Sequence, residues 1–365
     1  MSSKIYVTQP SLPPLDDYVE YLKIIWETGV ITHNGPLVRK LEYELSNYLN
    51  QKTIICVSNG TCALQLAIRA LDLRGEVITT PFTYIATANI IAWENCRPVF
   101  VDIDPQTWNI DPNKIEDKIT DQTSAILPVH VFSAPCEVDR IQTIASKNNL
   151  KVIYDAAHAF GVNLSGKSIL QFGDVSAVSF HATKLFNTAE GGACFTDDKI
   201  LEERIRRMRF FGFDTMNNIL DNGMNAKMTE ISAGLGLANF KFLDQVKQNR
   251  KMKYELFLSF LKDLPFINFQ SYKTDEYNYS YMPVVFEREQ ILLKIQNKLK
   301  SKNIFAKRYF YPSLNKLSIF QPQDSLPVSE KISRRILCLP LYDTLPVTQI
   351  KRICLYIAEV LKHKV

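Results

Sequence analysis

A lysine at the end of an apolar segment is the residue of this sequence best placed to do chemistry. Lys184 closes the run Ser179-Phe180-His181-Ala182-Thr183-Lys184 and is followed by a Glu190-Gly191-Gly192 turn. An amine held in a partly desolvated position loses its proton more easily than a surface amine, and the neutral amine can form a Schiff base. A lysine exposed on the surface is the ordinary alternative, so the neighbouring motifs must decide between the two.

An aspartate ends a second apolar segment. Asp155 follows Val152-Ile153-Tyr154 and precedes Ala156-Ala157-His158, which predicts a carboxylate in the crevice at the end of a strand. A helix N-cap is the alternative, since Asp is common in that role. For a pyridine cofactor, a carboxylate opposite the ring nitrogen keeps that nitrogen protonated and makes the ring an electron sink.

A third segment could bind an anion. Ser58-Asn59-Gly60-Thr61 directly follows a strand-like segment and opens a helix. Its backbone N–H groups and the helix dipole would then face an anion at the carboxyl edge of the sheet. A plain strand-to-helix turn capped by Asn or Ser explains the same residues equally well.

These segments need a framework that brings several strand ends together. Short β-branched segments alternate with amphipathic ones between residues 53 and 195, which predicts a mainly parallel sheet with helices on both faces. We expect strands at residues 53–57, 76–80, 98–101, 124–128, 151–155, 175–180 and 192–196. Helices are expected at 37–49, 63–71, 85–93, 138–148 and over most of 228–261. An α+β pattern follows (281–286, 290–301 and 347–362), so we predict a large domain 1–245 and a small domain 246–365.

Composition excludes several classes of protein. The 365 residues are 46% hydrophobic and 22% charged with a net charge of +5, which lacks the concentrated basic stripe of a nucleic-acid-binding protein. No apolar run approaches a membrane span, and no signal peptide is evident. The seven cysteines are scattered without a C-x-x-C pair, and the five histidines form no ligand-spaced cluster. The sequence predicts a cytoplasmic protein with no metal, membrane or nucleic acid bound.

Four motifs occur in an order that resembles the DegT/DnrJ/EryC1/StrS family of sugar aminotransferases. They are Ser58-Asn59-Gly60-Thr61, Thr80-Pro81-Phe82-Thr83-Tyr84, Asp155-Ala156-Ala157-His158 and Ser179-Phe180-His181-Ala182-Thr183-Lys184. The likeness extends from the segment at 32–36 to the segment at 334–340, which is nearly the whole chain. It implies the α/β type I fold of aspartate aminotransferase, with a seven-stranded, mainly parallel sheet in the large domain and a smaller α+β C-terminal domain. It also implies pyridoxal 5'-phosphate as the cofactor.

The resemblance implies roles for individual residues. Lys184 would form the Schiff base with the cofactor and act as the base that moves a proton, while Asp155 would face the pyridine nitrogen. The other implied cofactor contacts are Gly60, Thr61 and Ser179 at the phosphate, Tyr84 stacked on the ring and His158 beside the 3-hydroxyl. His158 stands where many relatives have Gln, and Ala182 stands where proline is frequent.

A later segment implies a homodimer. Gly223-Met224-Asn225-Ala226-Lys227-Met228 is similar to the family's Asn-x-Arg-Met segment, whose asparagine reaches the cofactor phosphate of the neighbouring subunit. Asn225 therefore implies active sites shared between two subunits. Lys227 stands where Arg is usual, which removes a planar, bidentate donor. The candidate substrate contacts are His181, Lys227, Arg308, Tyr309 and Tyr311.

In the implied reaction, L-glutamate supplies the amino group and a nucleotide-diphosphate keto sugar accepts it. The segments 5–14 and 308–312 look most like members that aminate C4 of dTDP-4-keto-6-deoxy-D-glucose to give dTDP-4-amino-4,6-dideoxy-D-glucose. A 3-keto sugar or a UDP-linked 4-keto sugar stays open as acceptor, because the same cofactor residues would serve. Same-fold sugar dehydrases have histidine in place of Lys184, which argues against that activity. A non-catalytic regulator is disfavoured, since fewer than 35 residues precede Gly35-Pro36, too few for a DNA-binding domain.

Overall fold

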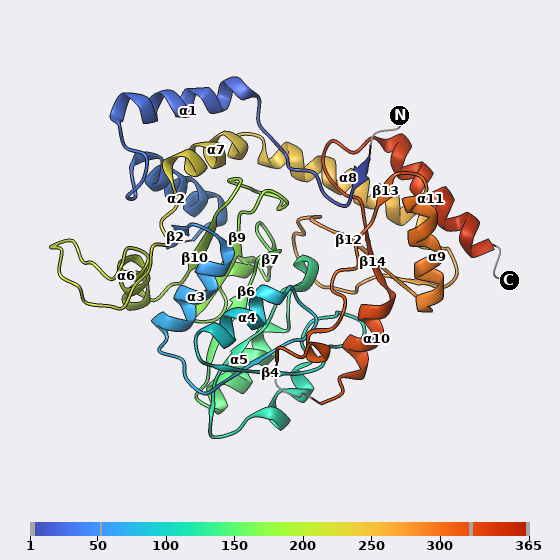
Figure 1. The fold of residues 1–365 in the computed structure, drawn as a ribbon, viewed down its shortest axis with the longest axis horizontal. Coiled ribbons are helices and arrows are strands. Elements are labelled where there is room, and N and C mark those ends of the chain that lie inside the picture. The colour runs from blue at the N-terminus through green and yellow to red at the C-terminus, as the bar shows by residue number, and fades with distance from the viewer. Residues whose placement is uncertain (1–3, 52, 321–323, 363–365) are drawn as a thin grey trace.

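The computed structural model describes residues 4–51, 53–320 and 324–362 and is built around a seven-stranded sheet (Figure 1). The strand order is β2-β10-β9-β6-β5-β3-β4; β10 runs antiparallel to β2 and β9, and the other pairs are parallel. The expected mainly parallel α/β sheet is confirmed, and each strand lies within one residue of its predicted ends. The strands are β2 (Ile54–Val57), β3 (Glu76–Thr79), β4 (Arg97–Phe100), β5 (Thr123–Leu127), β6 (Lys151–Asp155), β9 (Val175–Ser179) and β10 (Gly192–Phe195).

Helices cover both faces of this sheet because its strands are apolar on both sides. In β2, for example, Ile55 and Val57 pack in one hydrophobic cluster, and Ile54 and Cys56 pack in another. The first cluster includes residues of α3 (Gly60–Ala70), α4 (Ile85–Trp93) and α6 (Lys199–Met208). The second includes residues of α1 (Leu15–Thr28), α2 (Pro36–Leu49), α5 (Val138–Lys147) and α7 (Glu230–Phe240). Alternation along each strand therefore holds two helical layers on one sheet.

The C-terminal part has its own core. A three-stranded antiparallel sheet of β11 (Ile267–Asn268), β12 (Met282–Phe286) and β14 (Ile336–Leu339) packs with α8 (Leu243–Leu261), α9 (Glu289–Lys300) and α11 (Val347–Lys362). The expected helical region 228–261 is divided into α7 and α8, and the predicted boundary at residue 245 falls near the start of α8. Strand β1 (Ile5–Tyr6) pairs with β13 (Ile304–Phe305), so the N-terminal segment crosses to this part. The division at 245 stays a prediction.

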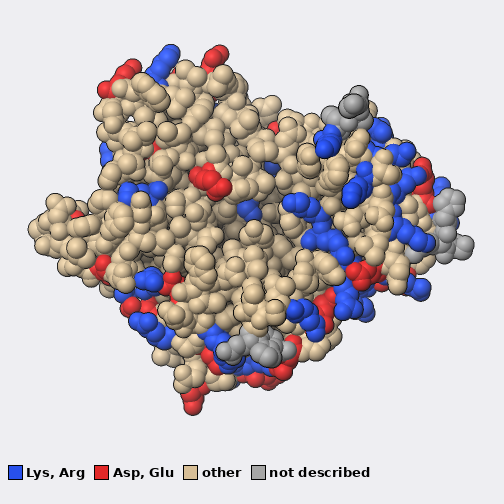
Figure 2. Space-filling model, viewed as in Figure 1, with Lys and Arg blue, Asp and Glu red and all other residues tan. Residues whose placement is uncertain are grey.

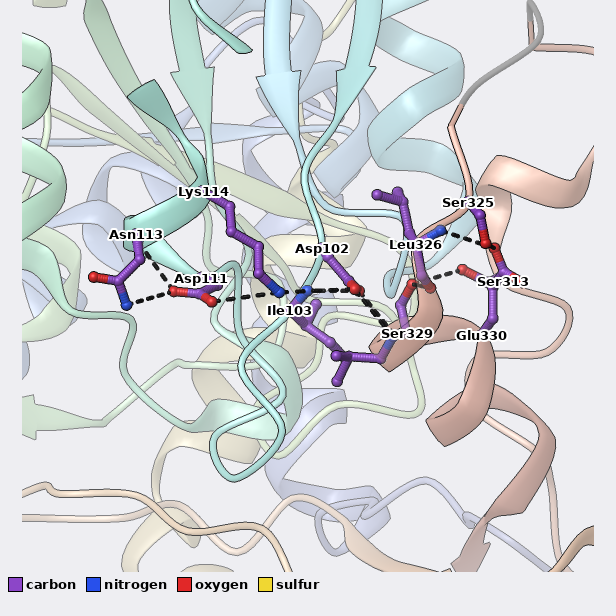
Figure 3. A network of polar contacts seen from close by, with 11 residues as sticks. Asp102, Ile103, Asp111, Asn113, Lys114, Ser313, Ser325, Leu326, Ser329 and Glu330 are labelled. Carbon is purple, nitrogen blue, oxygen red and sulfur yellow. Dashed lines mark hydrogen bonds and ion pairs between the residues drawn. The ribbon is translucent and has the colours of Figure 1, made fainter. Parts of the chain in front are cut away.

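A buried carboxylate joins the two parts of the chain (Figure 3). Asp102, two residues after β4, accepts hydrogen bonds from the backbone N–H groups of Val328 at 3.0 Å and Ser329 at 2.8 Å. These groups lie in the first turn of α10 (Pro327–Arg335), where N–H groups lack partners within the helix. Lys114 lies 3.8 Å from the same carboxylate. Asp102 therefore caps α10 from across the molecule and fixes it against the edge of the large sheet.

Further observations concern the cysteines, metal binding, membrane-spanning helices and the distribution of basic side chains. Six of the seven cysteines are buried and all seven are free thiols. Among the residues that the structure describes, no group of three or more His, Cys, Asp or Glu side chains is arranged to hold a metal. Within the same ranges, no helix is both long enough and apolar enough to cross a bilayer. The basic side chains visible in Figure 2 gather mainly over the C-terminal elements, including α9 and α11.

Candidate active site

A cavity of about 410 Å³ lies at the carboxyl edge of the large sheet. It brings together the ends of strands that are distant in sequence, together with a segment of the C-terminal part. Its lining includes nine of the residues predicted from the sequence: Gly60, Thr61, Tyr84, Asp155, His158, Ser179, His181, Lys184 and Tyr309. Asp155 and Ser179 are the last residues of β6 and β9, as the sequence predicted, while the roles of the nine residues stay predictions.

Lys184 lies in the turn after β9 with its amine directed into this cavity. The Nζ atom donates a hydrogen bond to the hydroxyl of Tyr281 at 3.2 Å. Burial lowers the pKa of the Lys184 amine to about 8, although the nearby charge of Asp155 opposes that shift. A substantial fraction of this amine is neutral near physiological pH, which is the form that attacks a carbonyl group.

Asp155 ends β6 and is held by two donors. Its carboxylate accepts hydrogen bonds from the hydroxyl of Thr87 at 2.8 Å and from the backbone N–H of Ala157 at 3.1 Å. Burial raises the pKa of the Asp155 carboxyl, while these two hydrogen bonds and the charge of Lys184 act in the opposite direction. A buried carboxylate of this kind is strongly stabilised by a cationic partner placed in the cavity.

The start of α3 forms an anion cradle. The side-chain oxygen of Asn59 caps the helix by accepting the N–H of Cys62 at 2.8 Å. Gly60 lies so close to β9 that an added Cβ would be 2.9 Å from the Cβ of Ser179. An added Cβ on Gly192 would be 2.6 Å from the carbonyl carbon of Asn59. Glycine at both positions lets the positive end of the helix reach the cavity wall, where it can face a phosphate.

His158 is fixed in a neutral form inside an aromatic stack. Its Nδ1 accepts the backbone N–H of Phe132 at 3.2 Å, which leaves the ring hydrogen on Nε2. The ring lies nearly parallel to those of Phe132 and Phe310, with centroids 6.1 and 6.0 Å away. Burial, with a smaller contribution from the charge of Lys184, lowers the pKa of His158 well below its ordinary value. The side chain therefore presents a neutral hydrogen-bond donor.

The remaining predicted residues do not line the cavity within one chain. Asn225 is exposed and accepts a hydrogen bond from the amine of Lys227 at 2.6 Å. Arg308 donates to Glu289 and to the carbonyl of Arg334, both at 2.8 Å, and its guanidinium carbon lies 3.6 Å from the centroid of the Tyr311 ring. The roles assigned to Asn225, Lys227, Arg308 and Tyr311 stay predictions.

The structure adds cavity residues that lie outside the quoted motifs, among them Thr87, Tyr281 and Lys307. Thr87 had a local signal, because it lies four positions after Thr83 of the Thr80–Tyr84 motif. In the structure the hydroxyls of Thr83 and Thr87 are 2.9 Å apart. Lys307 directly precedes the Arg308-Tyr309 segment. Tyr281 carries no such signal, since its partner Lys184 is 97 positions away in the chain.

Comparison with known proteins decides the family. The sequence model of the DegT/DnrJ/EryC1/StrS aminotransferase family matches residues 16–358. The chain belongs to this family. As a DegT/DnrJ/EryC1/StrS protein it is an aminotransferase that depends on pyridoxal 5'-phosphate. The residues present fit that cofactor: Lys184 suits its aldehyde, Asp155 its ring nitrogen and the start of α3 its phosphate.

Two relatives and one solved structure show how close the family likeness is. A dTDP-4-amino-4,6-dideoxy-D-glucose transaminase of Shigella dysenteriae is 42% identical over 348 residues, covering 94% of this chain and 95% of that protein. A transaminase of the same name from Escherichia coli is 40% identical over 355 residues, covering 93% and 94%. The crystal structure of DesI in the presence of its TDP-sugar product matches with a TM-score of 0.94 at 30% identity, covering 100% of this chain and 95% of that one.

Proposed function

We propose that this enzyme moves the amino group of L-glutamate to C4 of dTDP-4-keto-6-deoxy-D-glucose, giving dTDP-4-amino-4,6-dideoxy-D-glucose. One observation carries the proposal. The amine of Lys184, with a pKa of about 8, shares a cavity with the buried carboxylate of Asp155, in a chain 42% identical to a transaminase that bears this product's name.

The cofactor, when bound, supplies an electron sink that stabilises negative charge on the substrate carbon. We propose that Asp155 pairs with its ring nitrogen and that Lys184, once free, moves the proton between substrate carbon and cofactor. The remaining contacts would be Tyr84 on the ring, His158 at the 3-oxygen through Nε2, and Gly60, Thr61 and Ser179 at the phosphate. The neutral state of His158 supports its assignment, because it can donate to an oxygen without adding charge.

The proposed contacts with the nucleotide sugar are His181 and Tyr309, to which we add Lys307 as a third; all three residues line the cavity. Lys307 is exposed and lines the cavity, with its amine 5.8 Å from the centroid of the Tyr309 ring, and an ammonium group so placed can meet a diphosphate. Arg308 and Tyr311 stack on each other outside this lining. Their stacking supports the segment that carries Tyr309, and their own contact with the substrate stays a prediction.

We also propose a homodimer in which Asn225 and Lys227 of one chain complete the cavity of the other. Support comes from the exposed apolar side chains that precede this segment, namely Phe211, Met216, Ile219 and Leu220. Such a run of exposed apolar residues is typical of a surface that another chain covers. Mixed dimers of Lys184→Ala and Asn225→Ala chains should recover activity that neither variant has alone. No recovery in the mixture would contradict shared sites.

The acceptor can be tested directly. The purified enzyme is incubated with L-glutamate and a panel of dTDP- and UDP-linked 3-keto and 4-keto sugars, with Lys184→Ala as the inactive control. We expect amination only with the 4-keto dTDP sugar, and NMR of the product should place nitrogen on C4. Nitrogen on C3, or a preference for a UDP sugar, would contradict the proposed acceptor.

A further inference from the structure

Tyr281 enters the cavity from the C-terminal part of the chain. It immediately precedes β12, and its side chain is 8% exposed. Its hydroxyl accepts the hydrogen bond from the amine of Lys184 at 3.2 Å. The residue that provides the nucleophile and the residue that holds it thus come from different parts of the fold.

The ring of Tyr281 is held on several sides. It lies 4.7 Å from the ring of His158 at 54° and 5.4 Å from the ring of Phe132 at 56°. Tyr309 packs edge-on at 6.2 Å. A ring confined in this way has little rotational freedom, so its hydroxyl occupies a defined position. That position is within hydrogen-bond distance of the Lys184 amine.

The charged and titratable groups around Tyr281 keep its hydroxyl protonated. Burial raises the pKa of Tyr281, Cys338 on β14 and Asp155 act in the same direction, and Arg250 on α8 opposes them. Arg250 is fully buried, and its guanidinium nitrogens have no hydrogen-bond partner in the part of the chain that the structure describes. The facing groups are Lys184, Asp155, His158, Tyr309, Cys338 and Arg250. A protonated hydroxyl can accept a hydrogen bond from an ammonium group and donate one to a neutral amine.

We propose that Tyr281 is a positioning residue whose hydroxyl holds the amine of Lys184 whenever that amine is not bonded to the cofactor. The proposal rests on the transamination argued above, in which Lys184 must be free while it moves a proton. A lysine side chain has four flexible carbons, and its amine would otherwise sample many positions. Holding the amine in place raises the fraction of time in which it can reach the substrate carbon. Tyr281 itself neither gains nor loses a proton.

A nearby tyrosine provides a matched control. Tyr277 lies in the same segment, is 4% exposed, and donates its hydroxyl hydrogen to the backbone carbonyl of Phe132 at 2.5 Å. It has the same chemistry and a similar burial but no contact with Lys184. Changing Tyr277 to Phe therefore reports the structural effect of losing one buried tyrosine hydroxyl in this region.

The first test uses the full-length protein without cofactor. Tyr281→Phe and Tyr277→Phe are exposed to an amine-reactive acetylating reagent across a range of pH, and modification of Lys184 is followed by mass spectrometry. An ammonium group gains more from an oxygen acceptor than a neutral amine does, so loss of the hydroxyl favours the neutral amine. We expect the pH midpoint for Lys184 to fall by about one unit in Tyr281→Phe and to stay at the wild-type value in Tyr277→Phe.

The second test uses the holoenzyme and a single half-reaction with L-glutamate, followed by the visible absorbance of the bound cofactor. Tyr281→Phe should react about tenfold more slowly, with a larger isotope effect for glutamate deuterated at its α-carbon. A wild-type midpoint for Lys184 in Tyr281→Phe would overturn the proposal, as would an unchanged half-reaction rate. If the wild-type enzyme does not react with glutamate, the proposed function fails, and the labelling experiment still judges Tyr281 separately.

Discussion

Replacing Lys184 should stabilise the cofactor-free protein. Burial lowers the pKa of Lys184 from its ordinary value of 10.5 to about 8, which means that folding is less favourable while the amine carries its proton. Each pKa unit corresponds to about 1.4 kcal/mol, so removing the buried amine can raise the free energy of unfolding by at most about 3 kcal/mol. The side chain keeps part of its surface in solvent. We therefore expect Lys184→Met to raise the free energy of unfolding at pH 7 by about 2 kcal/mol.

The pH dependence distinguishes this effect from better packing. The native-state pKa lies below the unfolded-state value, so between about pH 8 and 10.5 the unfolded chain binds a proton that the native protein does not. Wild-type stability gains from rising pH in that window, and the Met variant lacks this gain. The advantage of Lys184→Met should therefore shrink to below about 1 kcal/mol at pH 9.5.

Urea denaturation of both proteins at pH 7 and pH 9.5, in the absence of cofactor, measures the difference. Lys307→Met is the matched control, because Lys307 lines the same cavity but is exposed. Lys307→Met should change the free energy of unfolding by no more than about 0.5 kcal/mol at either pH. A Lys184→Met variant that is no more stable than wild type at pH 7, or whose advantage grows at pH 9.5, would refute the argument.

Two further changes probe the carboxylates. Asp102→Asn should lower the free energy of unfolding by about 1–3 kcal/mol, because two backbone N–H groups of α10 lose a charged acceptor. The exposed Asp117→Asn should leave the denaturation midpoint unchanged, and an equal loss in both would contradict the capping role. Asp155→Asn should weaken retention of the cofactor at least tenfold in equilibrium dialysis, since the proposed pair between this buried carboxylate and the ring nitrogen loses its negative charge. Retention equal to wild type would show that Asp155 does not face the ring nitrogen.

The parts of the fold that the sequence predicted are those where a local pattern is unambiguous. The strands of the large sheet are buried on both faces, so their apolar segments are nearly continuous, and some of them end at a polar residue such as Asp or Ser. Asp155 and Ser179 stand at such ends, and the placement of the cavity follows from them.

Other parts depend on contacts that no local pattern encodes. Helix α1 was not predicted, because its buried residues are only Tyr21 and Ile25, and it is placed by packing on α7. The break between α7 and α8 falls within a continuous helical periodicity. Tyr281 and Lys307 reach the cavity only through the docking of the C-terminal part, which the capping of α10 by Asp102 helps to fix.

The most direct test is to identify the side chain that carries the cofactor. The holoenzyme is reduced with sodium borohydride and digested, and the peptides are examined by mass spectrometry. The structure predicts a pyridoxyl group on Lys184 alone, because that amine has a pKa of about 8 and faces Asp155 across the cavity. A label on another lysine, or an unlabelled Lys184 after saturation with pyridoxal 5'-phosphate, would contradict the assignment of the active site.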